Sequence, residues 1–195
     1  EPMDVVPYAV PLPDELSLTW AQRATVEMTS LLLRIEAGSE GRVRVCRSVA
    51  DIRQAKAAGA HAPVLHIEGC EALDRDLAFL DVLHAAGLRS LGPVWSRKNI
   101  FASGVPFRYP ASPDIGEGLT DLGRALVKRC NEKRILVDLS HMNEKGFWDI
   151  ARLSNAPLVA THSNAHALCA SSRNLTDRQL AAIRESGGLV GVNYA

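Results

Sequence analysis

The segment from Ile135 to Asn164 constrains the fold more than any other part of the chain. It holds two short apolar runs, Ile135–Leu139 and Pro157–Ala160, separated by an amphipathic stretch. This order of strand, helix and strand predicts a βαβ unit whose parallel strands are buried on both faces. A polar triplet with a histidine, His141 or His162, follows each run. Both histidines are therefore expected at the carboxyl edge of one sheet, where α/β enzymes place their chemistry.

The alternation of strand and helix recurs along the chain, which predicts a parallel α/β architecture. We expect a barrel rather than an open sheet, because polar residues follow the ends of several successive strands. In an open sheet they would follow only the two strands at the switch point. One domain over residues 1–195 is expected, with an irregular arm at 1–17 and a long functional loop at 96–118. The predicted helices are 18–37, 49–58, 74–86, 120–133, 143–153 and 177–185, and the predicted strands are 42–46, 63–67, 88–95, 135–139, 157–160 and 189–193.

Composition argues against several classes of partner. The 22 basic and 22 acidic residues balance, so no charged footprint for nucleic acid or an anionic membrane is expected. No apolar run approaches the roughly 20 residues that span a bilayer. The first 15 residues have acids and prolines where a secretion signal has a basic patch and an apolar block, so the sequence gives no evidence for export. The four cysteines are scattered without a CxxC pair, as is typical of reduced thiols in a cytoplasmic protein.

A carboxylate joins the two histidines as a candidate ligand. Side chains alternate along a strand, so His66 and Glu68 share a face, and Glu68 comes last before a glycine. One carboxylate and two imidazoles at strand ends suit a divalent transition metal such as zinc. The alternative is that local hydrogen bonds satisfy each side chain separately. Arg173 is either a solvated charge or a clamp for a substrate carboxylate.

At these residues the sequence resembles the renal-type membrane dipeptidases, which are binuclear zinc peptidases of the amidohydrolase-like barrel group. The resemblance is to a bacterial, cytoplasmic branch and covers nearly the whole chain. It implies a (β/α)8 TIM-type barrel of the metal-dependent hydrolase group. The matching stretches, in the family's order, are 66–69 (HIEG), 87–91 (GLRSL), 137–141 (VDLSH), 161–165 (THSNA) and 172–174 (SRN).

The resemblance also implies roles for single residues. Glu68 corresponds to the carboxylate that bridges two zinc ions, and His141 and His162 correspond to ligands of the second zinc. Arg173 corresponds to the arginine that holds the C-terminal carboxylate of a dipeptide, with Asn174 beside it. The implied reaction is hydrolysis of dipeptides, L,D-dipeptides among them, by a hydroxide held between two metals. A homodimer is an open alternative to a monomer.

The sequence departs from the family pattern in three places. It contains no His-x-Asp pair for the first zinc, and no match to the family's proton-handling aspartate. It therefore resembles the middle of the barrel, without the first and last strands, and these residues alone are expected to be inactive. The stretch Val94–Arg97 also lacks the histidine that the family offers to the substrate carbonyl. Two alternatives follow: a non-catalytic metal-binding remnant, or a related hydrolase of small amides or lactams.

Overall fold

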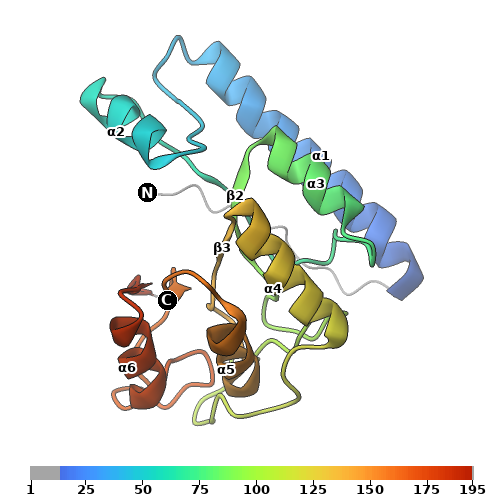
Figure 1. Cartoon of the computed structure of the whole chain (residues 1–195), viewed down its shortest axis with the longest axis vertical. Coiled ribbons are helices and arrows are strands. Elements are labelled where there is room, and N and C mark those ends of the chain that lie inside the picture. Colours follow the sequence, from blue (N-terminus) through green and yellow to red (C-terminus); the bar gives the residue numbers. More distant parts are fainter. Residues whose placement is uncertain (1–13, 195) are drawn as a thin grey trace. The chain divides into compact units, whose positions relative to one another are not determined.

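The computed structural model describes residues 14–194, with side chains from residue 18 onward (Figure 1). The chain divides into two compact units, Glu1–Ser90 and Leu91–Ala195. Each unit is described by itself. The single domain expected from the sequence stays a prediction.

Within its described residues, the first unit contains three helices, one complete strand and the start of a second. They are α1 (Asp14–Gly38), α2 (Val49–Ala57), β1 (Leu65–Glu68), α3 (Ala78–Ala86) and the start of β2 (Leu88–Gly92). Helix α1 begins four residues before its predicted start, so the irregular arm predicted over 1–17 is wrong for residues 14–17. Pro13 is the last proline before the helix, and the acids Asp14 and Glu15 favour a helical first turn. The rest of the predicted arm lies outside the described residues.

Local side chains explain where the elements of the first unit begin. The Ser48 side chain accepts from Asp51 N and caps α2, which begins at the predicted residue. The Asp74 carboxylate accepts from the backbone N–H groups of Ala78 and Phe79, so α3 begins four residues later than predicted. The strand predicted at 42–46 is reduced to a single parallel bridge between Val43 and His61.

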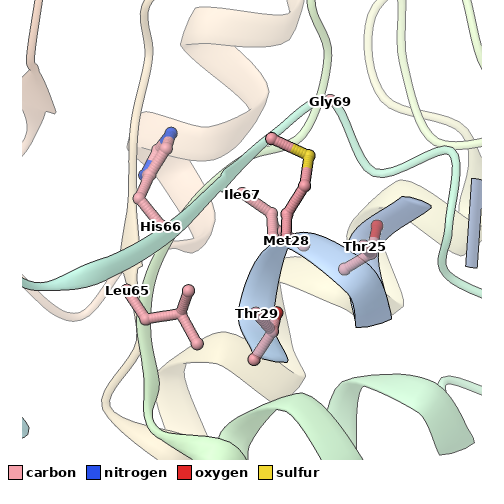
Figure 2. A pocket seen from close by; sticks show the side chains of 7 residues that line it. All are labelled: Thr25, Met28, Thr29, Leu65, His66, Ile67 and Gly69. Atoms are coloured by element: carbon pink, nitrogen blue, oxygen red, sulfur yellow. The ribbon is translucent and has the colours of Figure 1, made fainter. Parts of the chain in front are cut away.

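Strand β1 shows the alternation that the sequence predicted. Leu65 and Ile67 are buried, whereas His66 and Glu68 are half-buried on the other face. The His66 Nδ1 atom lies 2.8 Å from Ser90 Oγ, which agrees with a structural histidine. Figure 2 shows a pocket lined by residues of α1 and by residues of β1 and the following turn, namely Thr25, Met28, Thr29, Leu65, His66, Ile67 and Gly69.

The second unit continues the alternation of helix and strand. It contains α4 (Asp121–Lys133), β3 (Leu136–Val137), α5 (Glu144–Leu153), β4 (Val159–Ala160), α6 (Asp177–Glu185) and β5 (Leu189–Val190), which run from yellow to red in Figure 1. Strands β4 and β5 pair in parallel, with Val159 opposite Leu189. Asp138 forms a parallel bridge to Val159 and donates its N–H to Leu91 O at 2.8 Å. The parallel order predicted for these strands is confirmed.

Helix caps and a continuous apolar core hold the second unit together. The side chains of Thr120, Asn143 and Thr176 cap α4, α5 and α6, and Gln179 completes a capping box at α6. Buried side chains of the helices pack with those of the strands, among them Val127, Leu139, Phe147, Ile150, Ala160 and Ile183. The core therefore lies directly behind the turns that carry the two histidines.

The long loop at 96–118 is packed into the second unit. Phe101, Ala102 and Val105 are fully buried in it. The Asn143 side-chain amide also holds the loop, because its Nδ2 donates to the backbone oxygens of Ile115 and Glu117. Burial and these hydrogen bonds therefore fix the loop to the rest of the second unit.

Two further sequence expectations concern membranes and thiols. Within residues 14–194, no helix combines the length and apolar character that crossing a membrane requires. None of the four cysteines forms a disulfide, and only Cys169 is exposed. Burial raises the pKa of Cys130 to about 12, so this thiol stays protonated near neutral pH and acts as a small apolar core group.

Candidate functional site

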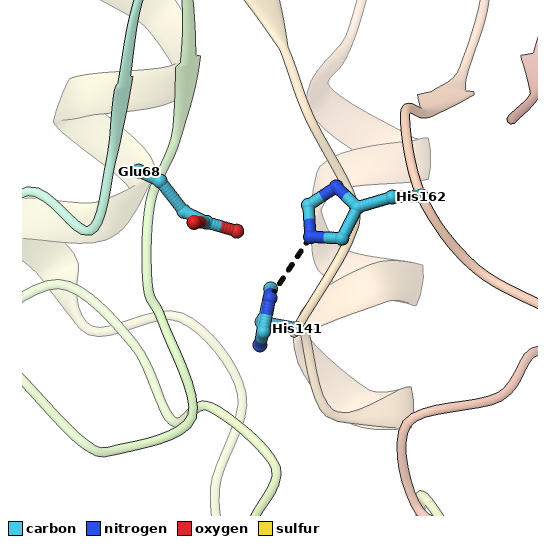
Figure 3. A group of neighbouring side chains, drawn as sticks. All are labelled: Glu68, His141 and His162. Carbon is cyan, nitrogen blue, oxygen red and sulfur yellow. Dashed lines mark hydrogen bonds between the residues drawn. The ribbon is translucent and has the colours of Figure 1, made fainter. Parts of the chain in front are cut away.

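The two histidines meet at the carboxyl ends of neighbouring parallel strands. His141 lies in the turn after β3, and His162 lies two residues beyond β4. Their Nε2 atoms face each other at 2.9 Å, as Figure 3 shows. The sequence prediction that both histidines lie together at the carboxyl ends of parallel strands is confirmed. The prediction of one sheet is wrong for the described residues, because β3 and β4 belong to separate sheets joined by the parallel bridge between Asp138 and Val159.

Hydroxyl groups hold the opposite nitrogen of each ring. The Nδ1 atom of His141 lies 2.8 Å from Ser96 Oγ, in the long loop. The Nδ1 atom of His162 lies 2.8 Å from Thr161 Oγ1. Each imidazole is thus oriented through Nδ1 and presents Nε2 to the other ring.

The backbone of His141 adopts an unusual conformation. Its φ of 66° lies in the left-handed region, which costs most residues roughly 1 kcal/mol or more. Neighbouring bonds hold the turn: Val105 N donates to the His141 oxygen at 2.9 Å, and Met142 N donates to Leu139 O. The chain reverses sharply at His141, and this reversal aims the ring at His162.

Side-chain hydrogen bonds join the two histidine turns. The buried Asp138 carboxylate accepts from Ser140 N at 3.0 Å, from Thr161 N at 2.9 Å and from the Thr161 hydroxyl. In return, His162 N donates to Ser140 Oγ at 3.1 Å. Asp138 is therefore a structural anchor between the turns.

Arg173 and Asn174 lie in the segment that follows the second histidine. Arg173 is only 8% exposed, so the expectation of a solvated charge is wrong. Its Nη2 donates to the His162 backbone oxygen at 3.1 Å, and its guanidinium lies 5.9 Å from the Phe107 ring centroid. The Asn174 amide is engaged in the loop itself, where Nδ2 donates to Cys169 O at 2.8 Å.

Two aromatic side chains stand beside His141, one from the residue before the long loop and one from the loop itself. The ring centroids of Trp95 and Phe107 lie 5.9 and 6.0 Å from the His141 ring, and 5.7 Å from each other. Phe107 remains largely exposed. An apolar wall with a free face therefore flanks the imidazole pair.

Glu68 belongs to the first unit, where it is the last residue of β1 (labelled in Figure 3). Gly69 follows with a φ of 83°, a conformation that suits glycine and ends the strand. The predicted position of Glu68 at a strand end is thus confirmed. Its predicted role as a bridging ligand stays a prediction.

The imidazole pair fits a bound transition metal. Zinc binds histidine nitrogens at about 2.0–2.1 Å in tetrahedral geometry, which places two such nitrogens about 3.3 Å apart. The observed separation of 2.9 Å needs only a small opening. His141 and His162 supply two imidazole nitrogens, a donor pair that suits a transition metal such as zinc.

Comparison with known proteins decides the family. The family model described as membrane dipeptidase, peptidase family M19, matches residues 2–195. The chain belongs to the membrane dipeptidase family. A crystal structure of a Rhodobacter sphaeroides metallo peptidase, bound to a phosphinate mimic of the dipeptide L-Ala-D-Ala, is 56% identical with a TM-score of 0.91, and the match covers 99% of this chain and 55% of that one.

A second solved structure and a related bacterial protein are also similar to this chain. A structure described as dipeptidase AC, a metallo peptidase of family M19, is 55% identical with a TM-score of 0.89 and coverage of 99% and 56%. An uncharacterized Klebsiella pneumoniae protein encoded in the pqqA 5' region is 49% identical over 93% of this chain and 65% of its own length. The chain thus spans about half to two thirds of these relatives. The likeness to the membrane dipeptidase structures confirms the predicted fold class.

Sequence reasoning did not assign roles to Ser96 and Thr161, the two hydroxyl partners of the imidazoles. Thr161 directly precedes His162, and this adjacency is a signal that the sequence contains. Ser96 lies 45 positions from His141, so only the folded loop brings them together.

Proposed function

We propose that the protein hydrolyses dipeptides at a zinc centre to which Glu68, His141 and His162 contribute. The facing Nε2 atoms of the imidazole pair carry the proposal, because oriented nitrogens of this kind are typical of metal sites. Membership in the membrane dipeptidase family supports it. So does the neighbour that binds a mimic of L-Ala-D-Ala, which makes L,D-dipeptides the first substrates to test.

In this proposal each residue has a distinct task. Glu68, His141 and His162 would be ligands of the zinc, Glu68 through its carboxylate and the two histidines through Nε2. When bound, the metal supplies a hydroxide near neutral pH and polarises the scissile carbonyl. Arg173 pairs with the C-terminal carboxylate of the dipeptide and Asn174 holds the loop around it. Trp95 and Phe107 exclude water from one side of the imidazole pair.

Removing the metal should abolish hydrolysis. We expect chelation followed by dialysis to lower the rate on L-Ala-D-Ala by more than about 100-fold, since the metal supplies both nucleophile and electrophile. Adding zinc should restore the rate as about two equivalents bind, counted by elemental analysis. Circular dichroism before and after chelation controls for unfolding. An undiminished rate in the metal-free protein would contradict the proposal, and stoichiometric metal without hydrolysis would favour a non-catalytic remnant.

A hydrolase of small amides or lactams is a second candidate. One observation favours it: Arg173 already donates to the His162 backbone and lies against Phe107, so its charge has structural uses without a substrate carboxylate. A lactam need not present a C-terminal carboxylate to this arginine.

The substitution Arg173→Gln separates the two candidates. For a dipeptidase we expect kcat/KM on L-Ala-D-Ala to fall about 30-fold or more, because losing one partner of a buried charge pair costs about 2–5 kcal/mol. The same dipeptide with an amidated C-terminus is the matched control, and its hydrolysis should change far less. Equal losses on both substrates would assign Arg173 a structural role and favour the lactam-type hydrolase.

The cytoplasmic location stays a prediction, and so does the homodimer. Both concern the whole protein. Neither bears on the chemistry proposed for the imidazole pair.

A further inference from the structure

We infer that Thr161 and Asp138 are positioning residues that set the tautomer of His162. They place its proton on Nδ1 and leave the Nε2 lone pair facing His141. The inference rests on the proposed function in one respect: the proposed zinc is the partner that this lone pair would bind.

The Thr161 hydroxyl has two polar neighbours and one hydrogen. Its Oγ1 contacts Asp138 Oδ2 in a short hydrogen bond and lies 2.8 Å from His162 Nδ1. An ionised carboxylate can only accept hydrogen bonds, whereas a hydroxyl donates one and accepts others. The buried Asp138 already accepts from two backbone N–H groups, and its Oδ2 is the acceptor for the Thr161 hydroxyl. The hydroxyl proton of Thr161 therefore points at Asp138.

This assignment decides the protonation of the ring. Because the hydroxyl proton is committed to Asp138, the 2.8 Å contact can be a hydrogen bond only if His162 Nδ1–H donates to Thr161 Oγ1. A neutral imidazole carries one proton, so Nε2 then holds a lone pair. Asp138 Oδ2 lies 3.9 Å from His162 Nδ1, beyond hydrogen-bonding distance, so the threonine is the necessary link.

Neighbouring groups hold Asp138 and the turn that carries Thr161 in place. Asp138 is 1% exposed and bonds to both histidine turns. Ser163 N donates to Gly191 O at 2.8 Å, and a Cβ added at Gly191 would lie 1.8 Å from Thr161 O. Because Gly191 has no side chain, the backbone that follows β5 can lie close to the backbone of the Thr161 turn. These contacts fix the backbone of the turn that carries Thr161, and the bond to Asp138 orients its hydroxyl.

His141 differs from His162 in what holds its Nδ1. The Ser96 hydroxyl can rotate to donate to Nδ1 or to accept from it. Without metal, the lone pair of His162 Nε2 accepts from His141 Nε2–H, and Ser96 donates to His141 Nδ1. The Ser96 hydroxyl therefore fits either tautomer of His141, whereas the Thr161 hydroxyl fits only one tautomer of His162. This contrast makes Ser96 the matched control.

Long-range proton–nitrogen NMR spectra of the metal-free protein at about pH 8, where free imidazole is neutral, test the inference directly. We expect wild-type His162 to carry its proton on Nδ1. Thr161→Val should shift it toward a mixture of both tautomers, and Thr161→Ser, which keeps the hydroxyl, should preserve the wild-type pattern. Ser96→Ala should leave the His162 tautomer unchanged.

Zinc titration of the same variants gives a second readout. Thr161→Val should weaken zinc affinity about 10- to 100-fold, the usual loss for a partner that orients a ligand, and Thr161→Ser should restore it. A wild-type His162 protonated on Nε2 would overturn the inference, as would a Thr161→Val variant with unchanged tautomer and affinity. Failure of the wild-type protein to bind zinc would instead overturn the proposed function, because the tautomer is read without metal.

Discussion

Glu68→Gln should lower kcat/KM on a dipeptide by more than about 100-fold. Residues that only orient metal ligands typically cost 10- to 100-fold when removed, so the loss of a bridging carboxylate should exceed that range. The amide keeps the shape of the side chain and loses the negative charge that a divalent cation needs. The measurements are steady-state kinetics on L-Ala-D-Ala and metal content by elemental analysis.

Glu132→Gln is the control for this experiment. The Glu132 side chain is 63% exposed on α4 and pairs with Arg129 at the surface. The same change of carboxylate to amide there should alter neither kinetics nor metal content, because exposed ion pairs contribute little. A Glu68→Gln variant with wild-type rate and full metal content would remove Glu68 from the proposed centre.

Phe147→Ala should destabilise the second unit by about 3–5 kcal/mol. The Phe147 side chain is 0% exposed and packs in the core between the helices and the strands that precede the histidine turns. Its removal would take away apolar burial and leave a cavity that the neighbouring side chains fill only in part. The free energy of unfolding is measured by urea titration, followed by the fluorescence of the adjacent Trp148.

The matched control is Val82→Ala on α3. Val82 is 60% exposed, so its truncation should cost less than about 0.5 kcal/mol. An unchanged slope of unfolding free energy against urea would show that Phe147→Ala alters stability rather than the unfolded state. A loss below 1 kcal/mol for Phe147→Ala would show that this core can repack around the missing ring, contrary to our expectation.

Several features of the molecule could be read directly from neighbouring residues in the sequence. Helix α6 begins and ends where predicted, because Thr176 and Gln179 form a capping box and Gly187 follows the last turn. The shared face of His66 and Glu68 follows from the period of two in any strand. The family followed from short ordered motifs, and the match over residues 2–195 confirms it.

Other features depend on residues that are far apart in the sequence. Helix α1 begins at Asp14, four residues before the predicted start at Leu18. The prediction misplaced this boundary because it relied on the proline content of the preceding residues. Arg173 was open to two interpretations, and only the fold buries it against the turn of His162. Local patterns carry no information on such contacts.

The sequence by itself determined the parallel α/β class, the helix caps, the candidate ligand residues and the family. Only the tertiary structure decided the left-handed turn at His141, the facing Nε2 atoms and the link from Asp138 through Thr161 to His162. The physical reason is that caps and strand parity arise from interactions within a few residues. The orientation of an imidazole, in contrast, is set by hydrogen bonds between two turns about 20 positions apart, which exist only after the strands have paired.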